Sequence, residues 1–234
     1  MKTLLLCLML LTSGQYVTSG YNSGPAGNNI SVVQSCVLNQ TSNTTTMTIT
    51  CGSAFTAGNT LVVGSSNTAN GGTWTGAAES GADTLTCATL NAGTDFYCYG
   101  VSIAGGGTTI VITNTNSTFC TCVAYELHNT ATTSPIDNTP ATLTQGSAAT
   151  WTGATVTLAA KDIFFLFGGS GSTNTTYTAA GGASLPATAK ASGGNQSGFG
   201  EFQIFAAGGS QTLSVSLSPS TAGRTFNVAV KVHP

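Results

Sequence analysis

Charged residues are scarce in this sequence, and their scarcity excludes whole classes of protein. Five Lys and Arg and seven Asp and Glu make up 5% of the 234 residues. Nucleic-acid binding needs clustered Lys and Arg that displace counterions from phosphates, and the few basic residues here are scattered. Low charge accompanies disorder only where hydrophobicity is also low. With 41% apolar residues in strand-length runs, the chain is expected to fold and to bind no nucleic acid.

Long apolar runs are also missing. The run at residues 4–11 follows Lys2 and is too short to span a bilayer. Small and polar residues come next, so residues 1–20 are predicted to be a signal peptide. The expected product has no membrane span and is secreted or held at the cell surface, with the periplasm as the alternative location.

Motifs with a defined chemistry are not found either. There is no C-x2-C pair of the kind that holds structural zinc, and no G-x-S-x-G turn of a serine hydrolase. The Gly-rich residues 168–171 lack the Lys and the helix of a phosphate-binding loop. Nothing in the spacing of the seven acids nominates the two carboxylates that glycoside hydrolysis requires. We therefore expect no catalytic residue, no cofactor and no metal site.

The residues that are abundant indicate strands. Threonine occurs 42 times and glycine 30 times, whereas no window has the apolar spacing of an amphipathic helix. This composition is typical of β-branched strand surfaces joined by Gly turns. The predicted fold class is all-β.

Two stretches of the chain repeat each other about 105 residues apart. Residues 103–113 (IAGGGTTIVIT) and 123–128 (VAYELH) correspond to residues 206–216 (AAGGSQTLSVS) and 228–233 (VAVKVH). Residues 57–63 likewise align with residues 159–165. A period this long exceeds that of solenoid repeats and is close to one small β-sandwich.

The repeat divides the chain into two antiparallel β-sandwich units. The first is predicted at residues 21–128 and the second at residues 146–234. Residues 129–145, which contain Pro135 and Pro140, form the connector, either a flexible linker or a closely packed crossover. Two immunoglobulin-like domains and one larger jelly-roll-like sandwich both fit this pattern.

Alternation within the repeated strands assigns a face to each side chain. The inward side is predicted to carry Val123, Tyr125, Leu127, Tyr97, Tyr99 and Val101 in the first unit and Phe226, Val228, Val230, Val232, Gly200, Phe202 and Ile204 in the second. The outward side is predicted to carry Cys98, Cys120, Cys122, and two solvated charges at matched positions, Glu126 and Lys231. His128 and His233 are also equivalent; they are interpreted as polar residues capping a duplicated strand, with a metal or acid–base pair as the alternative.

Six cysteines remain after the leader: Cys36, Cys51, Cys87, Cys98, Cys120 and Cys122. An even number in an exported chain indicates disulfides, whose pairing sequence alone leaves open. The preferred pairs are Cys36 with Cys51 and Cys87 with Cys98, which leaves Cys120 with Cys122. All six lie in the first unit, whereas seven of the ten Phe lie in the second. We expect disulfides to stabilise the first unit and the volume of buried aromatic rings to stabilise the second.

A few aromatic side chains are candidates for binding sugars. Trp74, Trp151, Tyr177 and Tyr21 are predicted either to stack on a carbohydrate or to fill the sandwich core, the commoner place for such rings.

Three segments carry a resemblance to known proteins. Residues 54–64 (AFTAGNTLVVG), 96–112 (FYCYGVSIAGGGTTIVI) and 123–127 (VAYEL) resemble a group of secreted, low-charge bacterial β-sandwich proteins. The resemblance covers most of the chain after the leader and implies export and a sandwich fold; it supplies no catalytic residues. Residues 127–129 (LHN) depart from it where a Ser-Gly turn is expected.

Together these patterns predict a secreted structural or adhesive protein without catalytic activity. It would act through surface contacts, by self-association or with a cell-surface or polysaccharide partner, because weakly charged faces and edge strands favour lateral association. The alternative function is a carbohydrate-binding module, and a less favoured one is a glycoside hydrolase.

Overall fold

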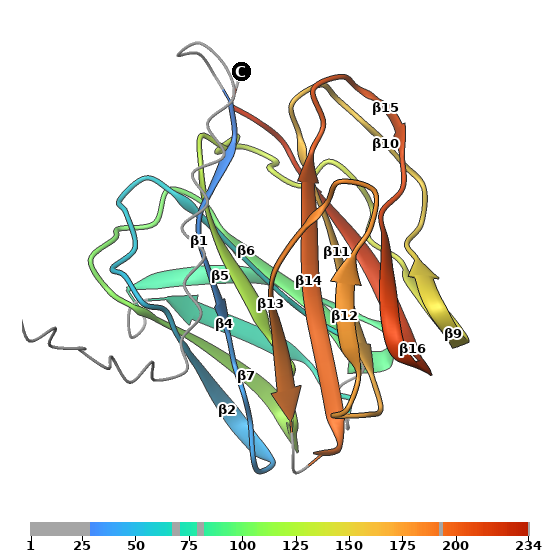
Figure 1. Ribbon diagram of the computed structural model, residues 1–234. Coiled ribbons are helices and arrows are strands. Elements are labelled where there is room, and N and C mark those ends of the chain that lie inside the picture. Colours follow the sequence, from blue (N-terminus) through green and yellow to red (C-terminus); the bar gives the residue numbers. More distant parts are fainter. Residues whose placement is uncertain (1–28, 67–70, 79–81, 192–193, 234) are drawn as a thin grey trace, which may run out of the picture.

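The structure, a computed structural model, describes residues 29–66, 71–78, 82–191 and 194–233 (Figure 1). The predicted signal peptide, Tyr21 and Glu79 lie outside the described residues. Within the described ranges the secondary structure is almost entirely strand, apart from short 3-10 turns such as that at Asn91–Gly93. No helix in these ranges is long and apolar enough to cross a membrane. The prediction of an all-β fold is confirmed.

The first unit is an eight-stranded sheet folded into two layers. Its order is β1-β8-β3-β6-β5-β4-β7-β2. The first half of β5 pairs with β4 and the second half with β6, so the sheet turns over at this strand. The layers β1-β8-β3-β6 and β5-β4-β7-β2 have the strand order of a jelly roll. The strands are β1 (Ser31–Val37), β2 (Thr44–Thr50), β3 (Thr60–Ser65), β4 (Trp74–Ala78), β5 (Asp83–Leu90), β6 (Asp95–Gly100), β7 (Thr109–Thr118) and β8 (Val123–His128).

The second unit has the same plan with longer strands. β16 pairs first with β12 and then with β11, so this single strand does what β7 and β8 do in the first unit. β9 runs beside both parts of β16, as β1 and β2 run beside β8 and β7. The strands are β9 (Thr142–Thr152), β10 (Val156–Leu158), β11 (Ile163–Ser170), β12 (Thr176–Ala179), β13 (Ser184–Ala191), β14 (Gln196–Ile204), β15 (Gly209–Gln211) and β16 (Ser214–Val230).

The duplicated sequence corresponds to duplicated structure. Repeated strands form the centre of the inner layer in each unit, β8-β3-β6 in one and β16-β11-β14 in the other, whereas the repeat at residues 103–113 reaches into β7 of the outer layer. The alignment of residues 57–63 with 159–165 is wrong by one residue, because Leu61 faces the core of the first unit whereas Ile163 faces away from the core of the second. The predicted sandwich of two duplicated antiparallel units is thus confirmed, and each unit has the strand order of a jelly roll instead of that of an immunoglobulin-like domain.

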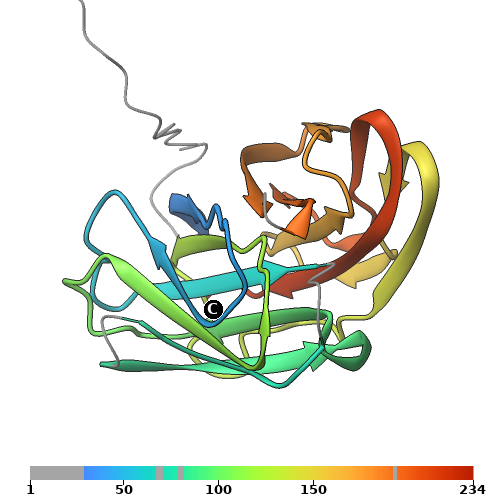
Figure 2. The same cartoon turned by 90° about the horizontal axis from the view of Figure 1, so that it is seen from below.

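The two inner layers pack face to face, and this contact forms a third core between the units (Figure 2). The side chains predicted to face inward, such as Tyr125 and Val228, lie in this central core. Cys98, Cys120 and Cys122, predicted on the outer face, are fully buried in the core of the first unit. The prediction was wrong because a layer in the middle of a stack is covered on both sides, so alternation cannot tell inside from outside.

The central core is tightly packed around Tyr125. Its ring centroid lies 4.8 Å from that of Phe165, and its hydroxyl donates a hydrogen bond to the Gly200 carbonyl. A Cβ atom on Gly200 would lie 2.7 Å from that hydroxyl, and one on Gly64 would lie 2.5 Å from the Phe167 ring. Glycine is therefore needed at both positions for the units to approach this closely.

The connector is a packed crossover and not a flexible linker. Thr130 and Ile136 form isolated β-bridges with Val232 and Val230, next to the end of β16. Lys231 N–H donates to the Pro135 carbonyl at 2.8 Å. Strand β9 already begins at Thr142, inside the range predicted as connector.

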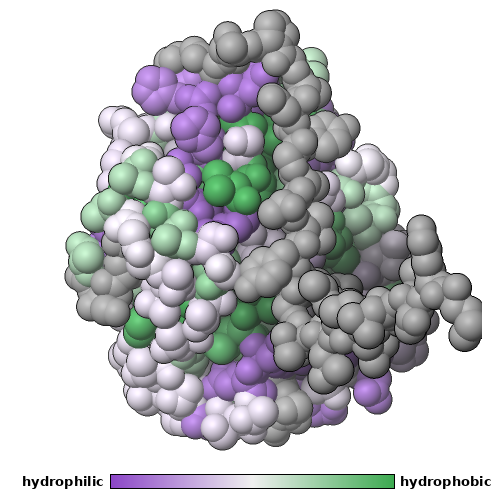
Figure 3. Space-filling model, turned by 60° about the vertical axis from the view of Figure 1, so that its left-hand side comes forward, coloured by the Kyte–Doolittle hydropathy of each residue, from purple (hydrophilic) through white to green (hydrophobic). Residues whose placement is uncertain are grey.

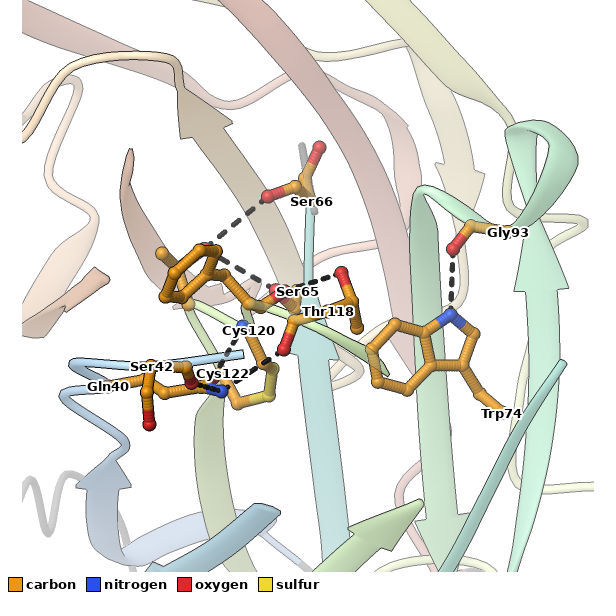
Figure 4. Close-up of a disulfide and its surroundings, with 11 residues drawn as sticks. Gln40, Ser42, Ser65, Ser66, Trp74, Gly93, Thr118, Cys120 and Cys122 are labelled. Carbon is orange, nitrogen blue, oxygen red and sulfur yellow. Dashed lines mark hydrogen bonds between the residues drawn. A yellow bond between two sulfur atoms is a disulfide. The ribbon is translucent and has the colours of Figure 1, made fainter. Parts of the chain in front are cut away.

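The three disulfides join Cys36 to Cys51, Cys87 to Cys98 and Cys120 to Cys122, the preferred pairs. The last bond lies between β7 and β8, and Figure 4 shows the Gln40 side chain beside it. Gln40 Oε1 accepts from the Cys120 N–H at 2.7 Å, and Gln40 Nε2 donates to the carbonyls of Thr118 and Ser42. The break between these two strands is thus closed by a disulfide and one buried amide.

Candidate functional site

The three described rings proposed to stack on sugars are all buried. Trp74 is 2% exposed, stacks on Phe96 at 4.0 Å and donates its Nε1–H to the Gly93 carbonyl (Figure 4). Trp151 is fully buried, and Tyr177 donates its hydroxyl to Ser170. The prediction of sugar stacking is therefore wrong for these residues, whose flat faces are covered by the cores of their own units.

Glu126, predicted to be a solvated charge, is buried and fully engaged. Its Oε1 accepts from Thr56 N–H at 2.7 Å and from Asn59 Nδ2 at 2.6 Å, and its Oε2 accepts from Gln34 Nε2 at 2.7 Å. Asn59 Oδ1 in turn lies 3.1 Å from His128 Nδ1. This carboxylate pins β1 and the loop before β3 to β8, a structural role that leaves no oxygen free for chemistry.

The duplicated histidines lie near the ends of equivalent strands: His128 is the last residue of β8, and His233 follows β16, which ends at Val230. Asn129, which follows His128, accepts a hydrogen bond at its carbonyl from the His233 N–H at 2.9 Å. Among the described residues, no group of three or more His, Cys, Asp and Glu could hold a metal ion.

Two carboxyl groups meet near the end of β16. Asp162 accepts from the N–H groups of Val232 and Ala159, both at 3.2 Å. Asp137 forms an ion pair with Lys231, with 3.1 Å between Oδ1 and Nζ. Burial, together with the neighbouring Asp137 carboxyl, raises the pKa of Asp162 to about 6 against the opposing effect of the two N–H groups. The arrangement ties the connector to the end of β16.

Glu201 is the most unusual acid in the chain. It lies on β14, opposite Leu166 of β11, and is fully buried. Neither carboxyl oxygen has a hydrogen-bond partner among the described residues. Burial raises the pKa of Glu201 to about 8, so the group is mostly protonated at neutral pH. A neutral carboxylic acid enclosed in a core weakens the fold instead of forming an accessible catalytic group.

The surface with the most regular pattern is the outer face of β5-β4-β7-β2. Strand registers place its side chains in three rows, because the alternate residues Met47 and Ile112 point into the core. We call these rows the threonine face: Thr46, Thr113 and Thr75 in the first, Thr48, Val111, Ala77 and Thr84 in the second, and Thr50 and Thr109 in the third.

The threonine face is uncharged and open to solvent. Six of its seven threonines are exposed, and Thr109 is half-buried. In the described strands no Lys, Arg, Asp or Glu occupies these rows. None of the seven hydroxyls forms a hydrogen bond with another described residue, so all remain available for outside contacts. Figure 3, which brings forward the side at the left of Figure 1, shows many pale residues of intermediate hydropathy, with hydrophilic purple and hydrophobic green groups among them.

Strand geometry gives the face a repeating spacing. Neighbouring strands lie about 4.8 Å apart, and alternate residues along one strand lie about 6.7 Å apart. Each threonine adds one hydroxyl, which both donates and accepts, and one methyl group. The result is a two-dimensional array in which seven of the nine positions carry a hydroxyl with a methyl group, and Val111 and Ala77 carry apolar groups alone.

Sequence reasoning missed this face. The signal is present, because Thr occupies every alternate position in residues 46–50 and both ends of residues 109–113, where Val111 lies between them; strand propensity alone also accounts for these residues. No protein-family model, curated protein or solved structure matches the chain.

Proposed function

We propose that the protein is a non-catalytic surface-contact module that acts outside the cell and binds through the threonine face. The observation that carries the proposal is the uncharged array of seven threonines in register on three adjacent rows. A lattice of repeated groups suits a partner that is itself repetitive, such as a solid surface or an assembled layer.

The disposition of the acids supports a role without catalysis. Of the six described acids, four are buried: Asp95, Glu126, Asp162 and Glu201. Asp95 accepts from the hydroxyls of Ser66 and Thr142, and Glu126 is held by three donors. Three disulfides are compatible with an extracellular location.

Adsorption of the full chain to insoluble surfaces tests the proposal. Cells, microcrystalline cellulose, chitin and ice are each mixed with the protein and separated, and the bound fraction is compared with that of the Thr113→Lys variant. Size-exclusion chromatography with light scattering reports self-association in parallel. We expect one of these partners to retain the wild type and release the variant. A strictly monomeric protein that adsorbs to none of them contradicts the proposal, as does turnover of a glycoside that Glu201→Gln abolishes.

A further inference from the structure

We infer that the threonine face binds ice, taking the ordered water at the surface of an ice crystal as its ligand. The inference rests on the proposed function and names the partner of the same surface. It follows from the groups that the face has, those that it lacks and the distances between them.

The groups that are absent exclude other partners. Without Lys or Arg in the described rows, the face has no attraction for phosphates or acidic polymers. The apolar side chains in the described rows are Val111 and Ala77. Both are half-buried, so the face has no large hydrophobic patch for a protein partner. Trp74, Trp151 and Tyr177 are buried, which leaves none of these rings to stack on the apolar face of a sugar.

The groups that are present suit ordered water. Each hydroxyl can replace one water molecule as donor and acceptor. The methyl group beside it excludes water from its own volume and so limits where the neighbouring water molecules can lie. The rows repeat at about 4.8 Å across the strands and about 6.7 Å along them. Oxygen atoms at an ice surface repeat at distances of this order, so several hydroxyls can match the lattice at once and their small contributions add.

The position of the face also suits a flat, rigid ligand. It is the outermost layer of the first unit, on the side away from the second unit, so neither the connector nor β9–β16 projects over it. The disulfide between Cys36 and Cys51 ties β1 to the end of β2, and the one between Cys87 and Cys98 ties β5 to β6. Both staples hold strands that border or form the threonine face, which keeps the array in register.

Uptake of the full chain into slowly growing ice tests the inference. Fluorescently labelled protein is frozen onto a cooled probe, and the fractions in ice and in liquid are measured. Wild type is expected to enter the ice. Thr113→Lys, in the middle of the first row, should lower that fraction about tenfold, because an ammonium group requires hydration that the ice lattice does not provide. Thr133→Lys adds the same charge at an exposed connector position and should leave uptake unchanged.

Each other outcome overturns the inference. Exclusion of the wild type from ice does so, as does equal uptake of wild type and Thr113→Lys or equal loss in Thr133→Lys. Circular dichroism and a thermal melt establish that all three proteins are folded. A wild type that ignores ice but pellets with cellulose or chitin in a Thr113-dependent way removes ice as the ligand and leaves the proposed function standing.

Discussion

The two units of this protein reach the same strand order by different physical means. In the first, separate strands β1 and β2 lie beside β8 and β7, and the break between β7 and β8 contains the disulfide of Cys120 and Cys122. In the second, β9 and β16 run without a break across both layers and pair along most of their length. The second unit has no cysteine. Disulfides and continuous strand ladders are thus alternative ways to hold the layers of a jelly roll together.

The difference extends to the cores. The first unit fills its own core largely with aliphatic side chains and cysteines, together with Trp74 and two Phe, Phe55 and Phe96. The core of the second is built around Trp151, Tyr177 and Phe199, whose rings lie within 6.5 Å of one another. We infer that buried aromatic rings supply in the second unit part of the stability that disulfides supply in the first.

The largest effect is expected from removing the aromatic centre of the second unit. Trp151→Ala deletes a fully buried ring and the donor to the carbonyls of Gly146 and Thr221. We predict that the free energy of unfolding falls by about 3–5 kcal/mol, measured by urea denaturation. Trp151→Phe keeps most of the volume and should cost clearly less. Equal losses in the two variants would show that aromatic volume does not support this unit.

Removing a disulfide from the first unit should have the next largest effect on the free energy of unfolding. Cys36 and Cys51 are separated by 15 residues, and a cross-link of that span stabilises by about 3 kcal/mol. The double variant Cys36→Ala/Cys51→Ala is predicted to lose that amount in urea denaturation. The pair Cys87→Ala/Cys98→Ala closes a shorter loop of 11 residues and should lose slightly less. Unchanged stability in the first double variant would contradict a stapling role.

The pH dependence of stability distinguishes the units in another way. The folded pKa of Glu201 is raised to about 8 from its ordinary value of 4.5. With respect to this group the fold is therefore most stable below pH 4.5, where both states are protonated, and it loses stability as the pH rises through 8, because only the unfolded chain ionises freely in that window. We predict a loss on the order of 3 kcal/mol between pH 5 and pH 8, measured by denaturation at each pH.

Two variants test which carboxyl group causes that pH dependence of stability. Glu201→Gln cannot ionise and should flatten the profile toward pH 8. Asp162, whose pKa is raised to about 6, acts in the same direction over a lower window, and Asp162→Asn should flatten the profile between pH 4 and pH 6. A wild type whose stability rises from pH 5 to pH 8 is incompatible with a buried, unpartnered Glu201.

The smallest effect is expected on the threonine face. Thr113→Lys changes an exposed side chain that forms no hydrogen bond with other described residues, so stability should stay within about 0.5 kcal/mol of wild type. A thermal melt measures this. A large loss would mean that the face is part of the fold and not a free surface.

The duplicated strands show how far the sequence predicts the fold. Residues 123–128 and 228–233 mark equivalent strands, and their alternation separates the two faces of each strand correctly. It could not predict that the face of Tyr125 contacts the other unit, because pairing between distant sheets leaves no periodic signal. The same limit placed Cys98 and Glu126 at the surface, since a strand covered on both sides alternates just like a half-exposed one.

The candidate site was less predictable. Threonine at alternate positions identifies an exposed strand face, yet the array depends on which strands are neighbours. The register of Thr46 with Thr113, and of Thr113 with Thr75, joins segments far apart in the chain. The absence of partners around Glu201 likewise depends on the packing of several strands and has no signature in sequence.

The two outer faces of the molecule provide the most direct test of whether function lies on the first unit. The outer face of the second unit has a row of three residues, Thr178, Ser216 and Thr150, in which serine lacks the methyl group. Ice uptake of Thr113→Lys and Thr178→Lys, each with one added charge on an exposed strand, is the decisive comparison. The account predicts that Thr113→Lys loses uptake and Thr178→Lys retains it. Equal uptake by the two variants, or loss only in Thr178→Lys, would contradict it.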